Sequence, residues 1–359
     1  MPYQENIPGT ERPPDFREII RRFIKINGEI ILSNEEKFRS NNSRFLFAFS
    51  ETPDHKQDGF IKIAKIDDRN MHQQLRRESE TMNVAVKLGI PTIKQYDEYA
   101  EFPEGYAAVH YEKLDSENGD LLSSAELIAS APPEYGEWEA KALLKTSGVE
   151  IPSDIDTAIF KKDGRNASPE TFWRVWKESE DKVLNIPEEK QKILDPQQIK
   201  DIQDVINELK PILEALIKDA NEENKYFFAH NDAAPDNTFF DTKTNKAILL
   251  DFEHSGVTRN RILAQLTDFG NFYAKSWPNP EMQSSFISTL MEQSARSIHE
   301  SYIISKATIL FGTLYLAKYA MDPNNKDHLM AKLILKSLPN QLKNLEETYI
   351  TLVPNTTHK

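Results

Sequence analysis

The sequence predicts an α+β fold in which a small part built around a sheet precedes a larger, mostly helical part. Short runs rich in aromatic and β-branched residues, which are typical of strands, gather in residues 1–113. In residues 114–359 apolar residues mostly recur every three or four positions, which indicates helices. A chain of 359 residues is long enough for two such domains, and residues 226–253 form a strand-rich stretch within the second.

The composition limits the possible functions. The chain has no cysteine, so disulfides, cysteine nucleophiles and thiolate metal sites are excluded. Its net charge of −13 argues against nucleic acid as a partner and suits a cationic small molecule, although solubility alone would also account for it. The polar, proline-rich beginning does not resemble a signal peptide, and the longest uncharged apolar run, 307–317, is too short to cross a bilayer. We therefore expect a cytoplasmic protein without membrane insertion.

The first third is expected to combine a helix with several strands. Residues 15–27 have apolar residues at helical spacing, and residues 29–32 can form a strand. A polar turn that includes Ser43 then leads into alternating phenylalanines within 45–49, which predict a strand directly after the turn. Residues 59–66 form a further apolar run with strand character.

A helix is predicted over residues 70–88, where a carboxylate interrupts an apolar face formed by Met71, Leu75, Met82 and Val86. That carboxylate is Glu78, and its burial is costly unless a cation pairs with it. The strand before the helix contains Lys62 and Lys65. Their side chains point to opposite faces of the sheet, so only one of them can pair with Glu78. Glu80 is the alternative acidic partner.

Apolar periodicity in the second part predicts several helices. Trp173 and Trp176 would share one face of such a helix, where core packing is favoured over a substrate pocket. Pro211 lies inside another helix and is expected to kink or divide it. The predicted helices span residues 121–131, 138–146 and 198–220 and most of 282–350.

The strongest functional signal lies in residues 226–253. A short buried strand runs into a polar loop, and two apolar runs around a turn near Lys243 then predict a β-hairpin. This hairpin brings Asn237 and Asp251 nearly opposite each other, and Asp232 lies in the loop that leads into it. Carboxylate and amide oxygens suit Mg²⁺, and a further carboxylate can accept a hydroxyl proton. The stretch therefore predicts a phosphoryl-transfer site, with a solvated polar turn as the alternative.

Two motifs in this stretch resemble those of the aminoglycoside phosphotransferase and choline kinase superfamily. They are His230-x-Asp232-x₄-Asn237 and the run Leu-Asp-Phe-Glu at 250–253. With Asn231 between His230 and Asp232, the first motif is most similar to the form found in choline/ethanolamine kinases. The resemblance implies a bilobal protein-kinase-like fold with a small antiparallel-sheet N-lobe and a larger helical C-lobe. It also implies transfer of the γ-phosphoryl group of ATP to a hydroxyl of a small molecule.

The resemblance assigns roles to residues that match the motifs. Asp232 would be the catalytic residue that takes the hydroxyl proton, and Asn237 and Asp251 would bind Mg²⁺. The resemblance also selects Lys62 over Lys65 and Glu78 over Glu80. Lys62, held by Glu78, would contact the ATP phosphates.

Further nucleotide contacts are implied by the order of the elements. Ser43 occupies the turn that would cover the phosphates, although no glycine is present there. Residues 106–114 predict a strand that leads to a hinge near 111–114, where backbone groups from Tyr111 to Lys113 would meet the adenine edge.

Supporting residues follow from the same resemblance. His230 would be buried and hold the catalytic loop, with a general-base role as the less favoured alternative. Asp268 would brace that loop, and helix N-capping is its other explanation. Phe272, Tyr273 and Trp277 fall near the substrate-side helix, where they pack in the core or form an aromatic wall for a cationic group.

The acceptor is the least determined part of the prediction. Ala233 and Ala234 replace the pair that usually follows the catalytic aspartate in the family, so the acceptor's identity stays open. We expect a choline- or ethanolamine-like amino alcohol. The alternatives are a kinase of aminoglycosides or other antibiotics, and a catalytically weak nucleotide-binding regulatory protein.

Overall fold

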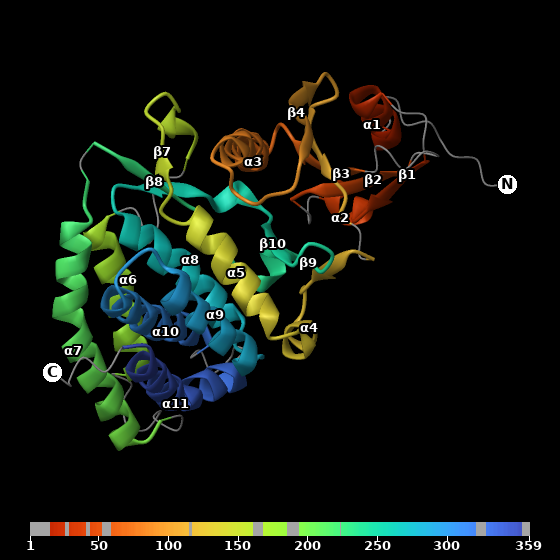
Figure 1. Ribbon diagram of the computed structural model, residues 1–359. Coiled ribbons are helices and arrows are strands. Elements are labelled where there is room, and N and C mark those ends of the chain that lie inside the picture. Colours follow the sequence, from red (N-terminus) through yellow and green to blue (C-terminus); the bar gives the residue numbers. More distant parts are fainter. Residues whose placement is uncertain are drawn as a thin grey trace. The chain divides into compact units, whose positions relative to one another are not determined.

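The computed structural model describes residues 15–25, 29–40, 44–51, 59–114, 117–160, 168–184, 194–222, 224–320 and 328–353. The chain divides into two compact units (Figure 1). The first consists of Met1–Glu80 and Lys94–Lys113, and the second of Thr81–Ile93 and Leu114–Lys359. The predicted α+β class is confirmed, because an antiparallel sheet forms the first unit and helices dominate the second.

The first unit contains a five-stranded antiparallel sheet with the order β1-β2-β3-β5-β4. Helix α1 (Phe16–Ile24) begins after Asp15, whose carboxylate caps it by accepting a hydrogen bond from the backbone N–H of Arg17. Its apolar side chains pack against the sheet in one hydrophobic core. The strands are β1 Glu29–Ser33, β2 Leu46–Glu51, β3 Gly59–Lys65, β4 Gln95–Phe102 and β5 Tyr106–Glu112.

The connection between β1 and β2 differs from the sequence expectation. It contains a short helix, α2 (Glu35–Arg39), which the sequence analysis did not predict, although both expected strands are present as β1 and β2. The helix forms because Arg39 pairs with Glu35 across one turn and Phe38 is buried in the core. Ser43 lies outside the described residues.

Helix α3 (Arg69–Lys87) follows the predicted span closely and ends before Gly89, whose φ of 70° suits a glycine after a helix. Its predicted apolar face is buried at Met71 and Met82, but Val86 is 57% exposed, so that part of the prediction is wrong. Glu78 is buried, as its place on this face indicated.

In the second unit, α10 lies among the other helices and packs against α6, α8, α9 and α11 (Figure 1). The predicted helix 121–131 is wrong at its beginning, because Gly119–Leu121 form a strand and Ser124 caps a helix that begins at Ala125. The helices are α4 Ala125–Ser130, α5 Glu134–Thr146, α6 Pro169–Leu184, α7 Pro196–Asp219, α8 Arg261–Lys275, α9 Pro280–Gln293, α10 Ile298–Ala320 and α11 His328–Leu352.

Helix α7 continues across Pro211 as a single element, so the proline does not divide it. Buried residues on both sides of the proline, among them Leu209 and Leu213, hold the two halves on the same core. Trp176 in α6 is buried against Phe311, which agrees with core packing rather than a pocket.

Two small sheets complete the second unit, with the orders β10-β9-β6 and β11-β8-β7. They bring residues 226–253 next to the helices, because α8 packs on β8 and β11, and α5 on β9 and β10. The strands are β6 Gly119–Leu121, β7 Glu150–Ile151, β8 Tyr226–Ala229, β9 Thr238–Asp241, β10 Lys246–Leu249 and β11 Gly256–Thr258.

Helices α8 and α10 touch through two glycines. A Cβ atom on Gly312 of α10 would lie 2.6 Å from the carbonyl oxygen of Gly270 of α8. The two backbones therefore meet without side chains between them.

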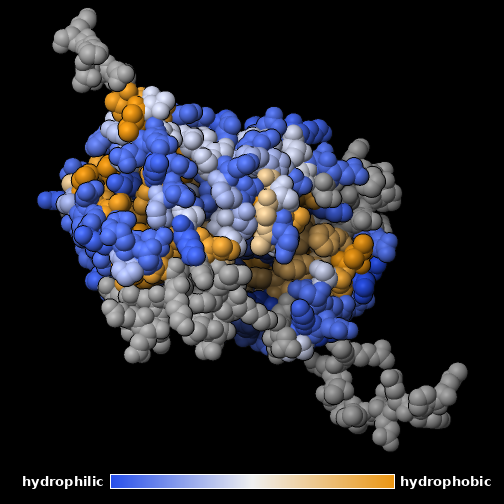
Figure 2. Space-filling view, turned by 90° about the horizontal axis from the view of Figure 1, so that it is seen from below, coloured by the Kyte–Doolittle hydropathy of each residue, from blue (hydrophilic) through white to orange (hydrophobic). Residues whose placement is uncertain are grey.

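The face of the molecule shown in Figure 2 is covered mainly by hydrophilic residues, with hydrophobic residues in smaller groups. Within the described ranges, every helix is either too short or too polar to cross a membrane.

Candidate active site

The predicted β-hairpin is present, and its register places two of the candidate metal ligands side by side. Strands β9 and β10 pair with Leu249 opposite Thr238, and the backbone N–H of Leu250 donates to the carbonyl oxygen of Asn237 at 2.9 Å. Asp251 is the next residue, so it lies one position from the residue that faces Asn237. The turn is centred where the sequence indicated, because Lys246 pairs with Asp241.

His230 is fully buried at the beginning of the loop that connects β8 to β9. Its Nε2 lies 2.8 Å from the carbonyl oxygen of Leu250, to which it must donate, and its Nδ1 faces the backbone N–H of Asp232 at 3.4 Å. Both ring nitrogens therefore contact the protein backbone. The geometry suits a residue that holds the loop rather than one that removes a proton from a substrate.

Asp268 contacts the same loop from helix α8. Its carboxylate accepts hydrogen bonds from the backbone N–H groups of His230 at 2.9 Å and Asn231 at 2.7 Å, and from the hydroxyl of Ser147 at 2.6 Å. Burial raises the pKa of Asp268, while these hydrogen bonds act in the opposite direction. N-capping is excluded for Asp268 because Asn260 caps α8.

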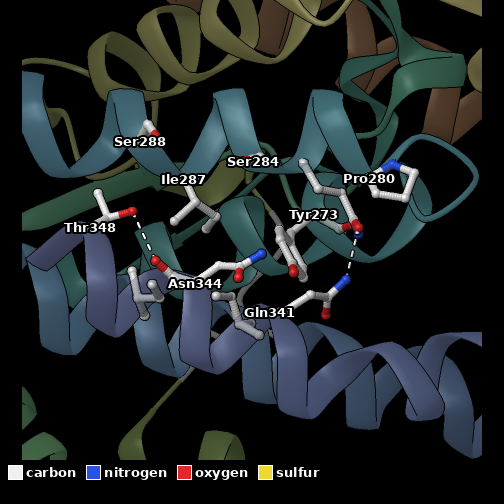
Figure 3. A pocket seen from close by; sticks show the side chains of 11 residues that line it. Tyr273, Pro280, Ser284, Ile287, Ser288, Gln341, Asn344 and Thr348 are labelled. Carbon is white, nitrogen blue, oxygen red and sulfur yellow. Dashed lines mark hydrogen bonds between the residues drawn. The ribbon is translucent and has the colours of Figure 1, made fainter.

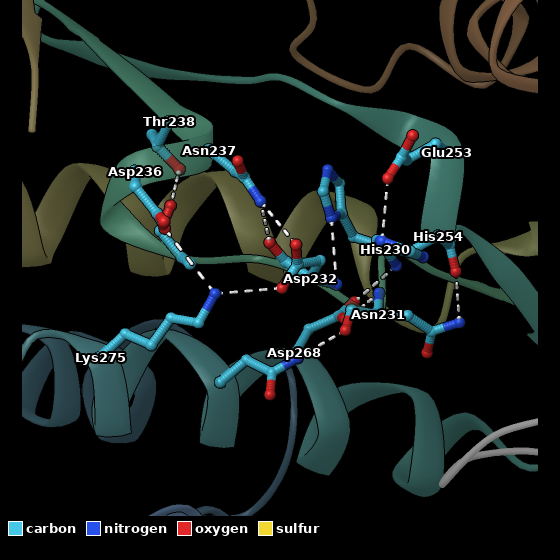
Figure 4. Close-up of polar contacts among 12 residues, drawn as sticks. His230, Asn231, Asp232, Asp236, Asn237, Thr238, Glu253, His254, Asp268 and Lys275 are labelled. Atoms are coloured by element: carbon cyan, nitrogen blue, oxygen red, sulfur yellow. Dashed lines mark hydrogen bonds and ion pairs between the residues drawn. The ribbon is translucent and has the colours of Figure 1, made fainter. Parts of the chain in front are cut away.

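Asp232 is held in place by two side chains (Figure 4). The Nδ2 of Asn237 donates to Oδ2 of Asp232 at 2.8 Å and to its carbonyl oxygen at 3.0 Å. The Nζ of Lys275 lies 3.1 Å from Oδ1 of Asp232 and 3.8 Å from Oδ1 of Asp236. The carboxylate is thus fixed in orientation and paired with a cation, although 30% of its side chain is still exposed.

Lys275 is a site residue that the sequence interpretation missed. A signal was available, because Asp268, Asn271 and Lys275 occur at intervals of three and four and so share one face of the mostly apolar helix α8. All three contact the catalytic loop, and the Nδ2 of Asn271 donates to the carbonyl oxygen of Asn231 at 2.6 Å.

The oxygens that could hold a metal lie next to this network. Because Nδ2 of Asn237 donates to Asp232, the Oδ1 of Asn237 is turned away from that carboxylate, as Figure 4 shows. Glu253 has one buried carboxylate oxygen without a hydrogen-bond partner in the described part of the chain. No cluster of three or more histidine and acidic side chains fit to hold a metal occurs among the described residues. Mg²⁺ commonly takes one or two carboxylates from the protein and its other ligands from substrate phosphates and water.

Two residues of the site have an unusual backbone conformation. Asn231 has φ of 68° and Asp251 has φ of 58°, values that residues other than glycine adopt infrequently. Such strained positions persist where the surrounding contacts hold them, and they concentrate at functional sites. They support a functional assignment for this loop and for the residue after β10.

A pocket of about 210 Å³ is lined in part by Asp236 and Lys275, and Lys275 connects it to Asp232. We call it the Trp277 pocket. It combines one carboxylate, one ammonium group and an indole ring with apolar walls. Its lining includes Leu122, Leu316 and Met330 in addition to Asp236, Lys275 and Trp277.

The other two candidate aromatic residues lie elsewhere. Phe272 is fully buried and packs against Phe286 in the core. Tyr273 lines a separate cavity of about 90 Å³ between α9 and α11, together with Gln341 and Asn344 (Figure 3). Burial raises the pKa of Tyr273. Of the three aromatic residues, Trp277 is therefore the one in the pocket next to Asp232.

In the first unit, the structure pairs Lys62 with Glu78. The Nζ of Lys62 lies 2.9 Å from Oε1 and 3.0 Å from Oε2 of Glu78, and both side chains are largely buried. The rival residues are engaged differently, because Lys65 lies over the ring of Phe38 and Glu80 pairs with Arg76. That Lys62 contacts phosphates stays a prediction.

The two residues predicted at the hinge lie at the end of β5. Tyr111 is buried and pairs with Phe60 of β3 and Gln95 of β4, and Lys113 directly follows the strand. Their contact with adenine stays a prediction.

Comparison with known proteins identifies the family. The family model of choline/ethanolamine kinase matches residues 118–334, which include the loop from His230 to Asn237, both candidate metal ligands of the hairpin and Asp268. No match was found among curated proteins. Similar solved structures include a Plasmodium vivax ethanolamine kinase, 14% identical, which covers 96% of this chain and 99% of its own with a TM-score of 0.46.

Two further structures have similar coverage. A spectinomycin phosphotransferase in complex with ADP and spectinomycin is 12% identical, covers 95% of this chain and 100% of its own, and has a TM-score of 0.50. A microcompartment-associated aminopropanol kinase is also 12% identical, covers 93% and 98%, and has a TM-score of 0.48. At these identities the likeness concerns the fold alone. The expected kinase-like fold is confirmed.

Proposed function

The chain belongs to the choline/ethanolamine kinase family and is an ATP-dependent small-molecule kinase, and on that premise we propose that its acceptor is a small cationic amino alcohol. The observation that carries the proposal is the Trp277 pocket. Its lining includes Lys275, which pairs with Asp232, and it offers an indole face and the carboxylate of Asp236. An aromatic face and a carboxylate are the two groups that attract an ammonium ion most directly.

Asp232 would orient the acceptor hydroxyl and take its proton as the bond to phosphorus forms. Its Oδ2 is fixed by Asn237 and its Oδ1 by Lys275, so the carboxylate needs no reorganisation when the acceptor arrives. Phosphoryl transfer depends mainly on positioning and on neutralising charge, and this arrangement supplies the positioning.

Asn237, Asp251 and the phosphates of ATP would hold Mg²⁺ at the open end of the hairpin. The metal would neutralise charge on the phosphoryl group that is transferred. Lys62, oriented by Glu78, would contact the phosphates through its ammonium group. Ser43, Tyr111 and Lys113 would complete the nucleotide site, and His230 and Asp268 would hold the catalytic loop in the geometry described above.

The size of the Trp277 pocket favours an amino alcohol over an antibiotic. Pockets that enclose drug-sized ligands measure about 300–1,000 Å³, whereas this one measures about 210 Å³. A compact acceptor such as choline or ethanolamine suits that volume better than a multi-ring aminoglycoside. The presence of Asp232, Asn237 and Asp251 together argues against a regulatory protein without activity.

ADP release with Mg-ATP tests the proposal. The panel holds choline, ethanolamine, thiamine, several aminoglycosides and simple sugars, and compares the natural chain with Asp232→Asn. The matched control is Asp204→Asn on the exposed side of α7. We expect stimulation by one amino alcohol, a loss of at least about a thousandfold in kcat for Asp232→Asn, and little change in ATP affinity or in the control.

Two results would contradict the proposal. Stimulation by an aminoglycoside alone would move the acceptor to the antibiotic class. Equal turnover in Asp232→Asn would remove that residue from its role.

A further inference from the structure

A second site with chemistry of its own lies in the second unit, away from the catalytic loop. It is a cavity of about 360 Å³ lined by the last turns of α5, the first turns of α8 and the segment that joins α9 to α10. We call it the basic cavity. Its lining includes the cationic residues Lys141, Lys145, Arg261 and Arg296, and none of its lining residues is acidic.

This concentration of positive charge is unusual for the chain, whose net charge is −13. Lys141 is partly neutralised because it pairs with Glu137. Within the described residues, Arg261 and Arg296 form no ion pair with any acidic group. The negative charge of Glu300 acts to raise the pKa of Arg296. The Glu300 carboxylate, however, already accepts hydrogen bonds from the backbone N–H and the hydroxyl of Ser297.

The two arginines affect each other. Burial, and in addition the positive charge of Arg261, lowers the pKa of Arg296 to about 10. Like charges so placed repel each other, and an anion between them would remove that cost. Arginine is also the residue whose planar, forked donors suit phosphate oxygens best.

The cavity contains a buried polar group without a partner. Gln265 lies one turn after Arg261 on α8 and is only 2% exposed, and its side-chain oxygen has no hydrogen-bond partner in the described part of the chain. An unpaired buried amide costs free energy unless a ligand or water binds it. The amide can present its NH₂ group to an anion, since a half-turn of the group exchanges its nitrogen and oxygen.

The main chain also positions Arg261. Gly148 has φ of 79° and approaches so closely that a Cβ atom there would lie 2.6 Å from Cγ of Arg261. The first part of the arginine side chain therefore packs directly on bare backbone, where a side chain on residue 148 would displace it.

We propose that the basic cavity binds a small soluble anion of the phosphate or pyrophosphate type, held by Arg261, Arg296, Gln265 and the two lysines. Its volume exceeds the need of a single chloride ion, and its positive groups come from separate segments that surround it. An anionic lipid headgroup shares this chemistry, but the enclosure between α5, α8 and the loop before α10 favours a free anion.

Isothermal titration calorimetry with sodium pyrophosphate tests the proposal, at constant ionic strength and with a chelator present to exclude Mg²⁺. We expect one pyrophosphate per chain, with the Kd raised at least about tenfold in Arg261→Gln/Arg296→Gln. The control Arg21→Gln/Arg174→Gln changes the net charge equally at exposed positions outside the lining of the cavity and should bind normally.

Further arms identify where the anion binds. Lys62→Met/Glu78→Leu, which removes both charges of the buried pair, should leave pyrophosphate binding unchanged, because Lys62 belongs to the proposed nucleotide site. Unchanged binding in Arg261→Gln/Arg296→Gln would overturn the proposal, and so would a loss in Lys62→Met/Glu78→Leu. Binding to phosphatidylcholine vesicles that contain phosphatidic acid, with none to pyrophosphate, would overturn it in favour of a lipid.

The variants are expected to fold, because they remove two charges that repel each other. Thermal melting without ligand checks this, and the double variant should melt at or above the temperature of the natural chain. If the double variant does not fold, the single variant Arg261→Gln, at an exposed position, replaces it. Its Kd for pyrophosphate should also exceed that of the natural chain, by a smaller factor.

Discussion

Two lysine–carboxylate pairs occur at the candidate sites, and they differ in burial. Lys62 and Glu78 meet through both carboxylate oxygens, with 11% and 3% of their side chains exposed. Lys275 and Asp232 meet through one oxygen at 3.1 Å, with 36% and 30% exposed. The first pair is sealed inside one unit, whereas the second borders a pocket.

This difference in burial gives the two pairs different roles. A buried ion pair has lost its hydration, so either partner is costly to leave alone, and the pair acts as a fixed structural element. An exposed pair contributes little to stability and exchanges readily with water or ligand. The partly exposed Asp232 carboxylate can therefore meet an acceptor while it stays paired with Lys275, whereas the buried Lys62–Glu78 pair is closed to such an exchange.

The largest expected effect follows from breaking the buried pair. Glu78→Leu leaves the Lys62 ammonium group without the Glu78 carboxylate and should lower the free energy of unfolding by about 3–5 kcal/mol. Lys62→Met/Glu78→Leu removes both charges and should recover most of that stability, yet kcat/KM for ATP should stay at least about a hundredfold below the natural value.

Urea unfolding and steady-state kinetics on the same preparations separate the two effects. If the double variant is as active as the natural chain, the pair is structural only and Lys62 has no role at the phosphates.

A buried carboxylate without a cation sharpens the comparison. Glu139 in α5 is fully buried, and within the described chain neither of its oxygens makes a hydrogen bond that meets ordinary geometry. Burial raises its pKa from 4.5 to about 8, the charge of Asp268 acts in the same direction, and nearby Thr238 opposes it. Glu139 therefore stays protonated in the folded chain at neutral pH.

The pH dependence of stability follows from that shift. Between about pH 4.5 and 8 the unfolded chain loses the Glu139 proton while the folded chain keeps it, so this residue's contribution to stability falls as the pH rises. Glu139→Gln has no such proton. Its free energy of unfolding, relative to that of the natural chain, should rise by about 2–4 kcal/mol from pH 5 to pH 8.

Urea unfolding at several pH values measures this difference. Gln198→Glu in the first turn of α7, which introduces an exposed carboxylate, controls for general effects of pH. A constant difference between Glu139→Gln and the natural chain across the range would show that Glu139 is already ionised in the folded state.

The smallest expected effect concerns the exposed pair. Lys275→Gln should change the free energy of unfolding by no more than about 1 kcal/mol. It removes a positive charge from the Trp277 pocket, so the KM of a cationic acceptor should fall by about two- to tenfold. An uncharged alcohol isostere of choline should show no such change.

Initial-rate kinetics at low and high salt measure this, with Lys218→Gln on the exposed face of α7 as the control. The difference should shrink at high salt because the charges are partly exposed. A higher KM for the cationic acceptor would place the ammonium group of the acceptor elsewhere.

The parts of the fold that sequence predicted are those specified by local patterns. The catalytic hairpin follows from a turn between two short apolar runs, and its centre was located correctly. Glu78 stands out because it interrupts an apolar face, so its burial could be expected. Both patterns are complete within about 20 residues, and local propensity and burial agree there.

Other features depend on contacts that sequence spacing does not reveal. Lys275 reaches Asp232 across 43 positions, because α8 packs on the sheet that carries the catalytic loop. Strand β4 was missed because its residues are largely polar and none is fully buried. Strand β6 has three residues and exists through pairing with β9, far along the chain.

The contact between Gly270 and Gly312 has a consequence for genetics. Helix α8 carries Asp268, Asn271 and Lys275, and it is seated on α10 by direct backbone contact. Even an alanine at Gly312 would have to push α8 away, because a carbonyl oxygen cannot rotate aside as a side chain does. A screen for inactive alleles should therefore return this glycine, although α10 contributes no residue to the catalytic loop.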